Sequence, residues 1–465
     1  MTTDERAPAR RPDHDPASVR AARAAVGGGT IGRDSLRLLI SQVIGNAGYF
    51  VGVVVLARAL GPSGRGSVAF ITVTALVASQ LAMLGVSDAT RVEAARSPEL
   101  RGVLLANLTL VALAGAAAVG VSLAAVFRLI PGLRPHGMGT AELVLLVLGT
   151  IAVAGVGAGY AFLQGCGQFR LYARVQASAP WLYAVLLAAA QFTVGLTVAR
   201  ALVIWTATQG LAGLWLLAAA ASEAHWTRPD RSVLRESLRF GLRAWIGSTS
   251  RMLNDRTDQI ITGLISSEAM LGTYAVAVNA SEILYYLPVS SSAALLPAVA
   301  GGDESTRLER VLRVHRVVLL LTIAASLLAA AVGPVMLPLV FGHTYRSAVG
   351  PFLILVPSAV GYATMQVFSG AALGSSAPGR SSLGPVVALI AQTVLDFVLI
   401  PHAGASGAAI AASAALLLAG LAAVVSFRAR FPFPWRLLVP SRHDLGTISQ
   451  SAHRILRSPA TFRTS

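Results

Sequence analysis

The sequence is poor in charge and contains no lysine. Of its 465 residues only 12% are charged and 55% are hydrophobic, whereas a soluble domain is about 25% charged. All 37 basic residues are arginine, so the GK[ST] loop of an ordinary P-loop ATPase is excluded. Cys166 is the only cysteine, which excludes an internal disulfide and a cysteine metal cluster. The eight histidines lack metal-ligand spacing, so we expect no metal site.

Long apolar runs, in contrast, recur along the whole chain, and short glycine- and proline-rich turns separate them. This pattern predicts an all-α polytopic membrane protein with about 12 transmembrane helices, and the short alternating segments of a β-barrel are absent. The expected spans are residues 36–60, 68–88, 103–127, 143–163, 175–198, 201–221, 241–264, 271–298, 317–341, 351–373, 383–400 and 407–427.

Arginine bias predicts the orientation of these spans. Fifteen loop arginines fall on the side of the N-terminus and six on the other, which favours cytoplasmic N- and C-termini in the cell membrane. The net charge of +16 then reflects basic loops against anionic lipid headgroups, and we expect no nucleic-acid partner. The polar N-terminal segment has no early apolar core, so it is not expected to be a cleaved signal peptide.

The spans divide into two similar halves. Residues 56–70 resemble residues 262–276 when Gly66 is aligned with Gly272, and residues 161–170 resemble 371–380. Six crossings per half give a parallel repeat, which places a substrate site near the midplane between the halves. The expected organisation is a disordered basic cytoplasmic tail (1–33), a six-helix lobe (34–222), a basic linker (223–241), a second six-helix lobe (242–427) and a basic tail (428–465). Residues 232–242 are interpreted equally well as an amphipathic helix on the inner leaflet or as a solvated linker.

The seventh expected span, residues 241–264, carries charge near its middle. Taken as a helix, it places Arg251, Asn254, Asp255, Asp258 and Thr262 on one stripe. Ionisable groups at this depth cost about 2.5–3.5 kcal/mol each, so they must face protein or water. The stripe therefore indicates either the wall of a wet cavity or a structural ion pair between Arg251 and Asp255. Arg256 lies off the stripe and needs a partner on another helix.

Several loose motifs together resemble a known family. They are Leu56-Ala57-Arg58-x-Leu60-Gly61-Pro62, Leu84-Gly85-x-x-Asp88, Arg256-x-Asp258-x-x-Ile261-x-Gly263, Leu271-Gly272-x-Tyr274-x-x-Ala277, Phe341-Gly342-x-x-Tyr345-x-x-Ala348 and Ile400-Pro401-x-x-Gly404. The chain resembles the polysaccharide-biosynthesis flippases, the Wzx-type branch of the superfamily that also holds MATE exporters and lipid II flippases. The resemblance implies a V-shaped, two-lobed bundle that works by alternating access.

The resemblance also implies a cargo. Relatives of this kind move an undecaprenyl-diphosphate-linked sugar unit from the cytoplasmic to the outer leaflet, without a cofactor. Expected partners are this polyprenyl-linked glycan and the bilayer, with a polysaccharide polymerase or glycosyltransferases as candidate protein partners. Arginine suits the diphosphate because its planar fork pairs with phosphate oxygens.

Candidate substrate-binding residues follow from that cargo. Arg251 is the first candidate for the diphosphate, and Arg58 or Arg256 the second. Asn254, Asp255 and Asp258 could bind sugar hydroxyls or hold the arginine. Gln42 and Asn46, four residues apart in the first span, could line the facing wall or bond between helices.

A buried carboxylate could couple transport to H⁺ or Na⁺. Glu282 in the eighth span, Asp396 in the eleventh and Asp88 at the inner end of the second are the candidates. Asp88 is equally explained by a helix cap or a pair with Arg91.

Two alternatives remain open, and a third is disfavoured. A cation-coupled MATE-like exporter of small molecules would share the fold. A lipid II flippase usually has two further spans. A glycan polymerase needs catalytic groups in an outer loop, whereas the longest outer loop here, residues 128–142, has one carboxylate. We therefore expect no enzyme activity.

Overall fold

The computed structural model describes residues 28–440 except 134–137, 225–226, 291–303 and 375–377. Every regular element in these ranges is helical. The longer helices are α2 (Gly28–Ala82), α3 (Val86–Arg96), α4 (Arg101–Leu110), α5 (Ala116–Leu129), α6 (Thr140–Gly165), α7 (Phe169–Thr193), α8 (Val198–Glu223), α9 (Arg231–Ile265), α10 (Glu268–Ser281), α12 (Glu304–Phe341), α13 (Val349–Leu355), α14 (Ser358–Gly374) and α16 (Leu383–Arg428). The short elements are α15 (Pro378–Ser381), η1 (Pro98–Leu100), η2 (Val111–Gly115), η3 (Pro131–Leu133), η4 (Glu282–Tyr285), η5 (His343–Ala348) and η6 (Trp435–Leu438).

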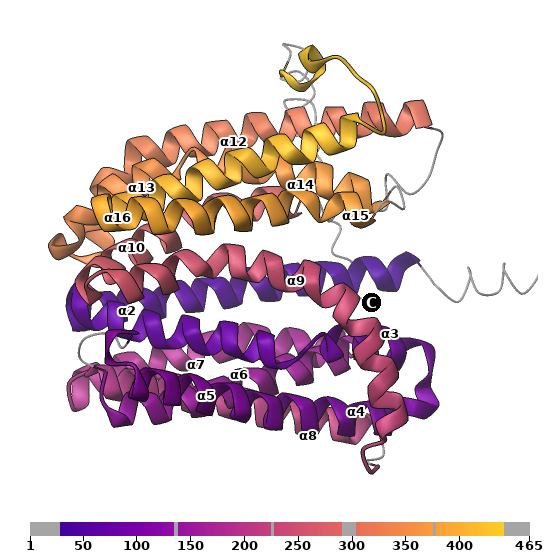
Figure 1. Cartoon of the computed structure of the whole chain (residues 1–465), viewed down its shortest axis with the longest axis vertical. Coiled ribbons are helices and arrows are strands. Elements are labelled where there is room, and N and C mark those ends of the chain that lie inside the picture. Colours follow the sequence, from indigo (N-terminus) through magenta and orange to yellow (C-terminus); the bar gives the residue numbers. More distant parts are fainter. Residues whose placement is uncertain (1–27, 134–137, 225–226, 291–303, 375–377, 441–465) are drawn as a thin grey trace, which may run out of the picture.

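The helices form two bundles that lie side by side with roughly parallel axes (Figure 1). The N-terminal bundle contains α2 and α4 to α8, and the C-terminal bundle contains α12 to α16, with α9 and α10 between them. In Figure 1 the loops that the sequence predicts to face outward gather at the left end, and α3 and α15 lie at the right end. We refer to these as the predicted outer and inner ends.

Two long helices are hairpins joined at a glycine. The chain reverses within α2 at Gly61, which has φ 65°, and within α16 at Gly404, which has φ 55° (Figure 1). A positive φ is a conformation that glycine adopts without the penalty of a Cβ. Each hairpin also carries a proline next to the turn, Pro62 or Pro401. These breaks fall between expected spans.

By length and composition, seven of the described helices could cross a membrane, or eight if the bent pair of residues 343–355 and 358–373 is one span. The chain is thus an all-helical multi-pass membrane protein. This number counts α2 and α16 once each and leaves out the charged α9 and the short α10. The twelve-span count itself stays a prediction.

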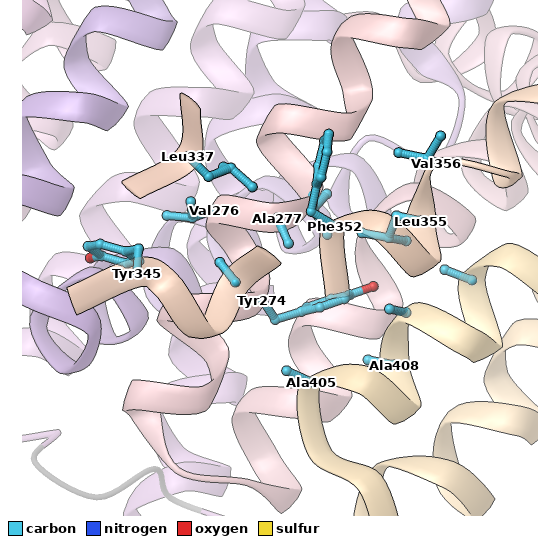
Figure 2. Packing of buried hydrophobic residues seen from close by; sticks show 14 of the residues in the cluster. Tyr274, Val276, Ala277, Leu337, Tyr345, Phe352, Leu355, Val356, Ala405 and Ala408 are labelled. Carbon is cyan, nitrogen blue, oxygen red and sulfur yellow. The ribbon is translucent and has the colours of Figure 1, made fainter. Parts of the chain in front are cut away.

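Small residues allow the helices of the C-terminal bundle to approach closely. A Cβ on Gly420 of α16 would stand 2.7 Å from the carbonyl oxygen of Gly361 in α14, which is the close packing that small residues permit in membranes. Figure 2 shows the neighbouring apolar core, where Tyr274 of α10 lies among Phe352 and Leu355 of α13 and Ala408 of α16. Tyr274 is fully buried there, so its hydroxyl needs an internal partner.

Helix α9 begins earlier than the seventh expected span. It runs unbroken for 35 residues, so most of the expected linker 223–241 is its first part. The Asp230 side chain caps it by accepting hydrogen bonds from the backbone N–H groups of Ser232 (2.7 Å) and Val233 (3.1 Å). The Asn107 side chain of α4 in turn bonds both backbone groups of Asp230. Residues 232–242 are thus helical and continue into the rest of α9, and they contact α3 and α4; their expected position on the inner leaflet stays a prediction.

Candidate functional site

A polar cavity of about 400 Å³ lies between the two bundles. The first half of α2, α9, α10 with η4, and α14 with α16 supply its walls. Asp255 of α9 lines it and is exposed although it lies well inside the bundle, so water-sized molecules reach this depth. Two other residues of the charged stripe, Asn254 and Asp258, also line the polar cavity, and both are buried.

Arg256 and Glu282 form an ion pair in this cavity. Arg256 Nη1 lies 2.8 Å from Glu282 Oε1, and each side chain is 25% exposed. The sequence places Arg256 off the polar stripe and predicts a partner on another helix; in the structure this partner is Glu282 of η4. A charge-assisted bond in a half-buried site is stronger than a surface pair, because less water screens it.

Asp258 is held by neutral donors. The Tyr274 hydroxyl donates to its Oδ2 over 2.5 Å, and the backbone N–H of Gln259 donates to its Oδ1 over 2.7 Å. Both carboxylate oxygens of Asp258 are thus satisfied, which a buried charge requires. This also gives the buried hydroxyl of Tyr274 its partner.

Asp396 of α16 is fully buried, and neither of its carboxylate oxygens has a hydrogen-bond partner among the described residues. It interacts electrostatically with Asp258 and Tyr274. One turn earlier, Gln392 lines the polar cavity. A buried carboxylate without a partner is costly unless it binds a proton or a cation.

The other candidates lie in different places. Gln42 and Asn46 of α2 line the polar cavity opposite α9. Arg251 is exposed and does not line it, and no ion pair joins Arg251 to Asp255 in the described part of the chain. Asp88 pairs with Arg91 at 2.9 Å near the predicted inner end.

Several tyrosines line the polar cavity, and the sequence analysis did not predict this role for them. The rings of Tyr285 and Tyr362 stack with centroids 4.4 Å apart, and the Tyr285 hydroxyl bonds Ser358 Oγ over 2.7 Å. Tyr49 lines the same cavity. Gln392 could have been found as a polar residue inside an apolar span.

A second, apolar cavity of about 380 Å³ adjoins the first. Leu39, Val43 and Phe50 of α2 and Ile283 of η4 line it. Leu39, Val43 and Ile283 are exposed on the bundle surface. The two cavities share Gln42, Asn46, Tyr49, Glu282, Tyr286 and Val289. One space is therefore polar at the centre and apolar where it opens between α2 and η4.

The bundles close together at the predicted outer end. Arg58 of α2 donates from Nε to the carbonyl of Val340 (2.8 Å) and from Nη2 to that of Leu339 (2.6 Å), at the C-terminus of α12. The last carbonyls of a helix lack intrahelical partners and attract cations. Arg58 thus joins the bundles rather than lining the polar cavity.

The described residues contain no group of three histidine, cysteine or acidic side chains placed to hold a metal ion.

The family model described as polysaccharide biosynthesis protein matches residues 31–301 of the chain. No curated protein matches the sequence.

Solved transporters share the fold at low identity. An inward-facing multidrug resistance MATE transporter of the MOP superfamily is 16% identical over 85% of this chain and 98% of its own, with a TM-score of 0.67. Lipid II flippase MurJ in an inward closed conformation is 12% identical over 91% of each chain, with a TM-score of 0.70. An outward-facing MATE transporter is 16% identical over 85% of this chain and 95% of its own, with a TM-score of 0.57.

Proposed function

This chain belongs to the polysaccharide biosynthesis protein family, which comprises transporters rather than enzymes, and we propose that it is a flippase. The cargo is a polyprenyl-diphosphate-linked oligosaccharide, the repeat unit of a polysaccharide. The protein carries its head across the cell membrane by alternating access and needs no cofactor. Both termini lie in the cytoplasm, and polysaccharide polymerases or glycosyltransferases act beside it.

The junction of a polar and an apolar cavity is the observation that carries this proposal. A lipid-linked glycan has a large anionic head, which cannot enter hydrocarbon unaided, and a long apolar tail, which need not leave it. The polar cavity suits the head because amides, tyrosines and charges line it. The apolar cavity opens between α2 and η4 and suits the part of the tail that accompanies the head.

The closed outer end supports an inward-facing resting state. Arg58 bridges the bundles there, and the TM-score is higher for the inward-facing than for the outward-facing MATE structure. The hairpin turns at Gly61 and Gly404 support twelve crossings in two six-helix lobes, residues 34–222 and 242–427. Residues 223–241 join the lobes. The expected basic tails, residues 1–33 and 428–465, lie mostly outside the described residues, and α2 already begins at Gly28.

Within this scheme the charged residues of α9 bind the head. Arg251, on the side of the predicted inner end and electrostatically coupled to Asp255 and Tyr362, receives the diphosphate first. Arg256 meets it deeper in the cavity, where cargo competes with Glu282 for the guanidinium. Asp255, Asp258 and Asn254, with Gln42 and Asn46 opposite, bond sugar hydroxyls.

Asp396 is the carboxylate that we propose as the ion-coupling group. It is buried, its oxygens lack partners in the described structure, and it acts on Asp258 beside the cavity. Binding of H⁺ or Na⁺ would remove the cost of its charge. Glu282 is a second candidate because cargo could release it from Arg256. Asp88 has a partner in Arg91 and is the weakest of the three.

Reconstitution tests the proposal. Vesicles that contain the protein and a polyprenyl-diphosphate-linked saccharide should expose the saccharide on the opposite leaflet, as measured by access of a membrane-impermeant glycan-modifying enzyme. Arg251→Ala should slow this exposure more than Arg251→Lys, since lysine keeps the charge and loses the fork. If neither variant is slower, Arg251 does not bind the diphosphate.

The likeness in fold to MATE transporters favours one other function, cation-coupled export of small molecules. Cells that lack the protein distinguish the two. A flippase defect makes lipid-linked sugar accumulate on the inner leaflet, whereas unchanged lipid pools with altered drug tolerance would show an exporter. A defect in peptidoglycan precursors instead would point to lipid II.

A further inference from the structure

A third cavity, of about 310 Å³, lies where the N-terminal bundle meets α9 and α10. Residues from both halves of α2 and from α6 to α10 line it. It meets the polar cavity at Tyr49 and Arg256, which line both. The two cavities are therefore adjacent, so a cargo head in the polar cavity lies beside the third cavity.

Arg65 of α2 lines this third cavity and has no acidic partner among the described residues. It is only 4% exposed, its Nε has no hydrogen-bond acceptor among the described residues, and it interacts electrostatically with the neutral side chains of Tyr183 and Tyr345. Glu142 and Glu268 line a separate pocket nearer the predicted outer end, and neither pairs with Arg65. The Nε atom of Arg65 is buried without an acceptor, which is costly, and the cavity beside the guanidinium has room for an anion that would balance its charge.

The lining of the cavity carries positive charge and no compensating acid. Arg256 is the other charged residue in the lining, and no aspartate or glutamate contributes to it. Arg256 is already paired with Glu282, which belongs to the polar cavity. The field in the third cavity therefore comes mainly from Arg65 and attracts a negative group.

The remaining side chains suit a sugar. Tyr183 and Trp205 present aromatic rings, which stack on the apolar faces of pyranoses and match buried apolar surface. Gln209, Gln259 and Asn279 present amides that can donate to and accept from hydroxyls. Arginine is the side chain best shaped to bond a carboxylate with two parallel hydrogen bonds.

We infer that the third cavity is a specificity site for acidic glycans, in which Arg65 binds a carboxylate on the sugar while the diphosphate stays in the polar cavity. This inference rests on the proposed function and names the class of cargo that the flippase prefers. A uronic acid is the sugar of this chemistry.

A binding experiment tests it with two synthetic cargos on the same short polyprenyl diphosphate, one bearing glucuronate and the other glucose. Affinities are measured on the full-length protein in nanodiscs. The wild type should bind the glucuronate compound about tenfold more tightly, the ratio expected for one desolvated ion pair. Arg65→Gln should bring the ratio close to one. Arg346→Gln removes the same charge from an exposed position in η5 and should keep the ratio of the wild type.

The outcomes separate the inference from the proposed function. Equal weakening of both cargos by Arg65→Gln would assign Arg65 to the diphosphate and overturn the inference, as would a wild type without preference. Failure of the wild type to bind either cargo would remove the proposed function together with the inference.

Thermal unfolding without cargo gives an independent check. Arg65→Gln and Arg65→Met should both melt at a higher temperature than the wild type, because each removes an uncompensated buried charge. The glucuronate compound should then raise the melting temperature of the wild type more than that of either variant. A lower melting temperature for both variants would show that Arg65 has a structural role and would contradict the inference.

Discussion

Gly66 of α2 and Gly272 of α10 pack backbone against backbone at the predicted outer end. A Cβ on Gly66 would stand 3.0 Å from the amide nitrogen of Gly272, and a Cβ on Gly272 would stand 2.9 Å from that of Gly66. These are the two glycines that the internal repeat aligns. The repeat thus places equivalent turns against each other, where only residues without a side chain fit.

Gly66→Ala should weaken this outer closure. The added methyl group would also meet the carbonyl of Glu268, and overpacking of this kind costs about 1–3 kcal/mol. We expect the population of outward-open protein to rise about tenfold, as measured by distances between spin labels on the two outer ends. Gly210→Ala in α8, where a Cβ meets nothing within 4 Å, is the matched control. Equal distance distributions in both variants would show that the contact does not set the conformational balance.

The Arg256–Glu282 pair should matter far more than a surface pair. Arg256→Ala leaves the carboxylate of Glu282 half-buried without its cation, so transport should fall by at least about tenfold and the melting temperature should drop. Arg313→Ala breaks the exposed pair with Glu309 and should cost less than about 1 kcal/mol. If both variants transport and melt alike, cargo does not use Arg256.

Tyr274→Phe removes the hydroxyl donor of Asp258 and nothing else. A hydrogen bond to a buried charged group contributes about 1.5–3 kcal/mol, so unfolding by heat or denaturant should report a loss in this range. In Asp258→Asn the same tyrosine substitution should cost clearly less, since the charge is gone. Additive effects in the double mutant would mean that the 2.5 Å bond is not important for stability.

Asp396→Asn should uncouple transport from its ion gradient. An amide cannot exchange a proton and binds a cation weakly, so cargo exposure in vesicles should no longer respond to an imposed pH or Na⁺ gradient. Glu309→Gln, a neutralised surface carboxylate, should retain the full response. A gradient response that survives in Asp396→Asn would exclude this carboxylate as the coupling group.

The cap of α9 should weaken in acid. Hydrogen bonds from Ser232 and Val233 lower the pKa of Asp230 below the ordinary carboxyl value, about 3.9 in an unfolded chain. A depressed pKa in the folded state means that the cap contributes fully above about pH 3.9 and is lost as the pH falls through the folded pKa. Amide exchange of Ser232 and Val233 should therefore accelerate below this range in the wild type. Asp230→Asn should show no such acid-dependent step, and a step that persists in this variant would rule out Asp230 as its source.

The sequence predicts the fold class and the depth of the polar stripe from local information. Hydrophobic length and glycine-proline turns identify helices, and charge near the middle of the seventh span identifies a helix that must meet water or protein. Asp255 and Asp258 follow from this period alone. The helical period does not predict which residues from distant parts of the chain pair with the charges of α9. Arg256 meets Glu282 only because tertiary packing brings these two side chains together from different helices.

The exposure of Arg251 and Arg65 could not be predicted from the sequence either, because it also depends on which distant helices pack against them. The stripe groups Arg251 with Asp255, but the cavity covers only the part of α9 that α2 and η4 face. Arg65 gives no periodic signal at all, since it follows a tight turn and its burial depends on the packing of α6 to α8.

Helix α9 is unbroken and contacts helices on both sides, α2 and α3 on one and α16 on the other. Its first three turns contact α3 and the residue before it, beside the N-terminal bundle: Ser237 Oγ donates to Glu93 Oε2, and the backbone of Gly241 contacts that of Gly85. Its far half packs against α16 of the C-terminal bundle. If the bundles move apart during transport, α9 must either bend near Gly241 or break one of these two sets of contacts, so a stiff α9 would oppose that movement.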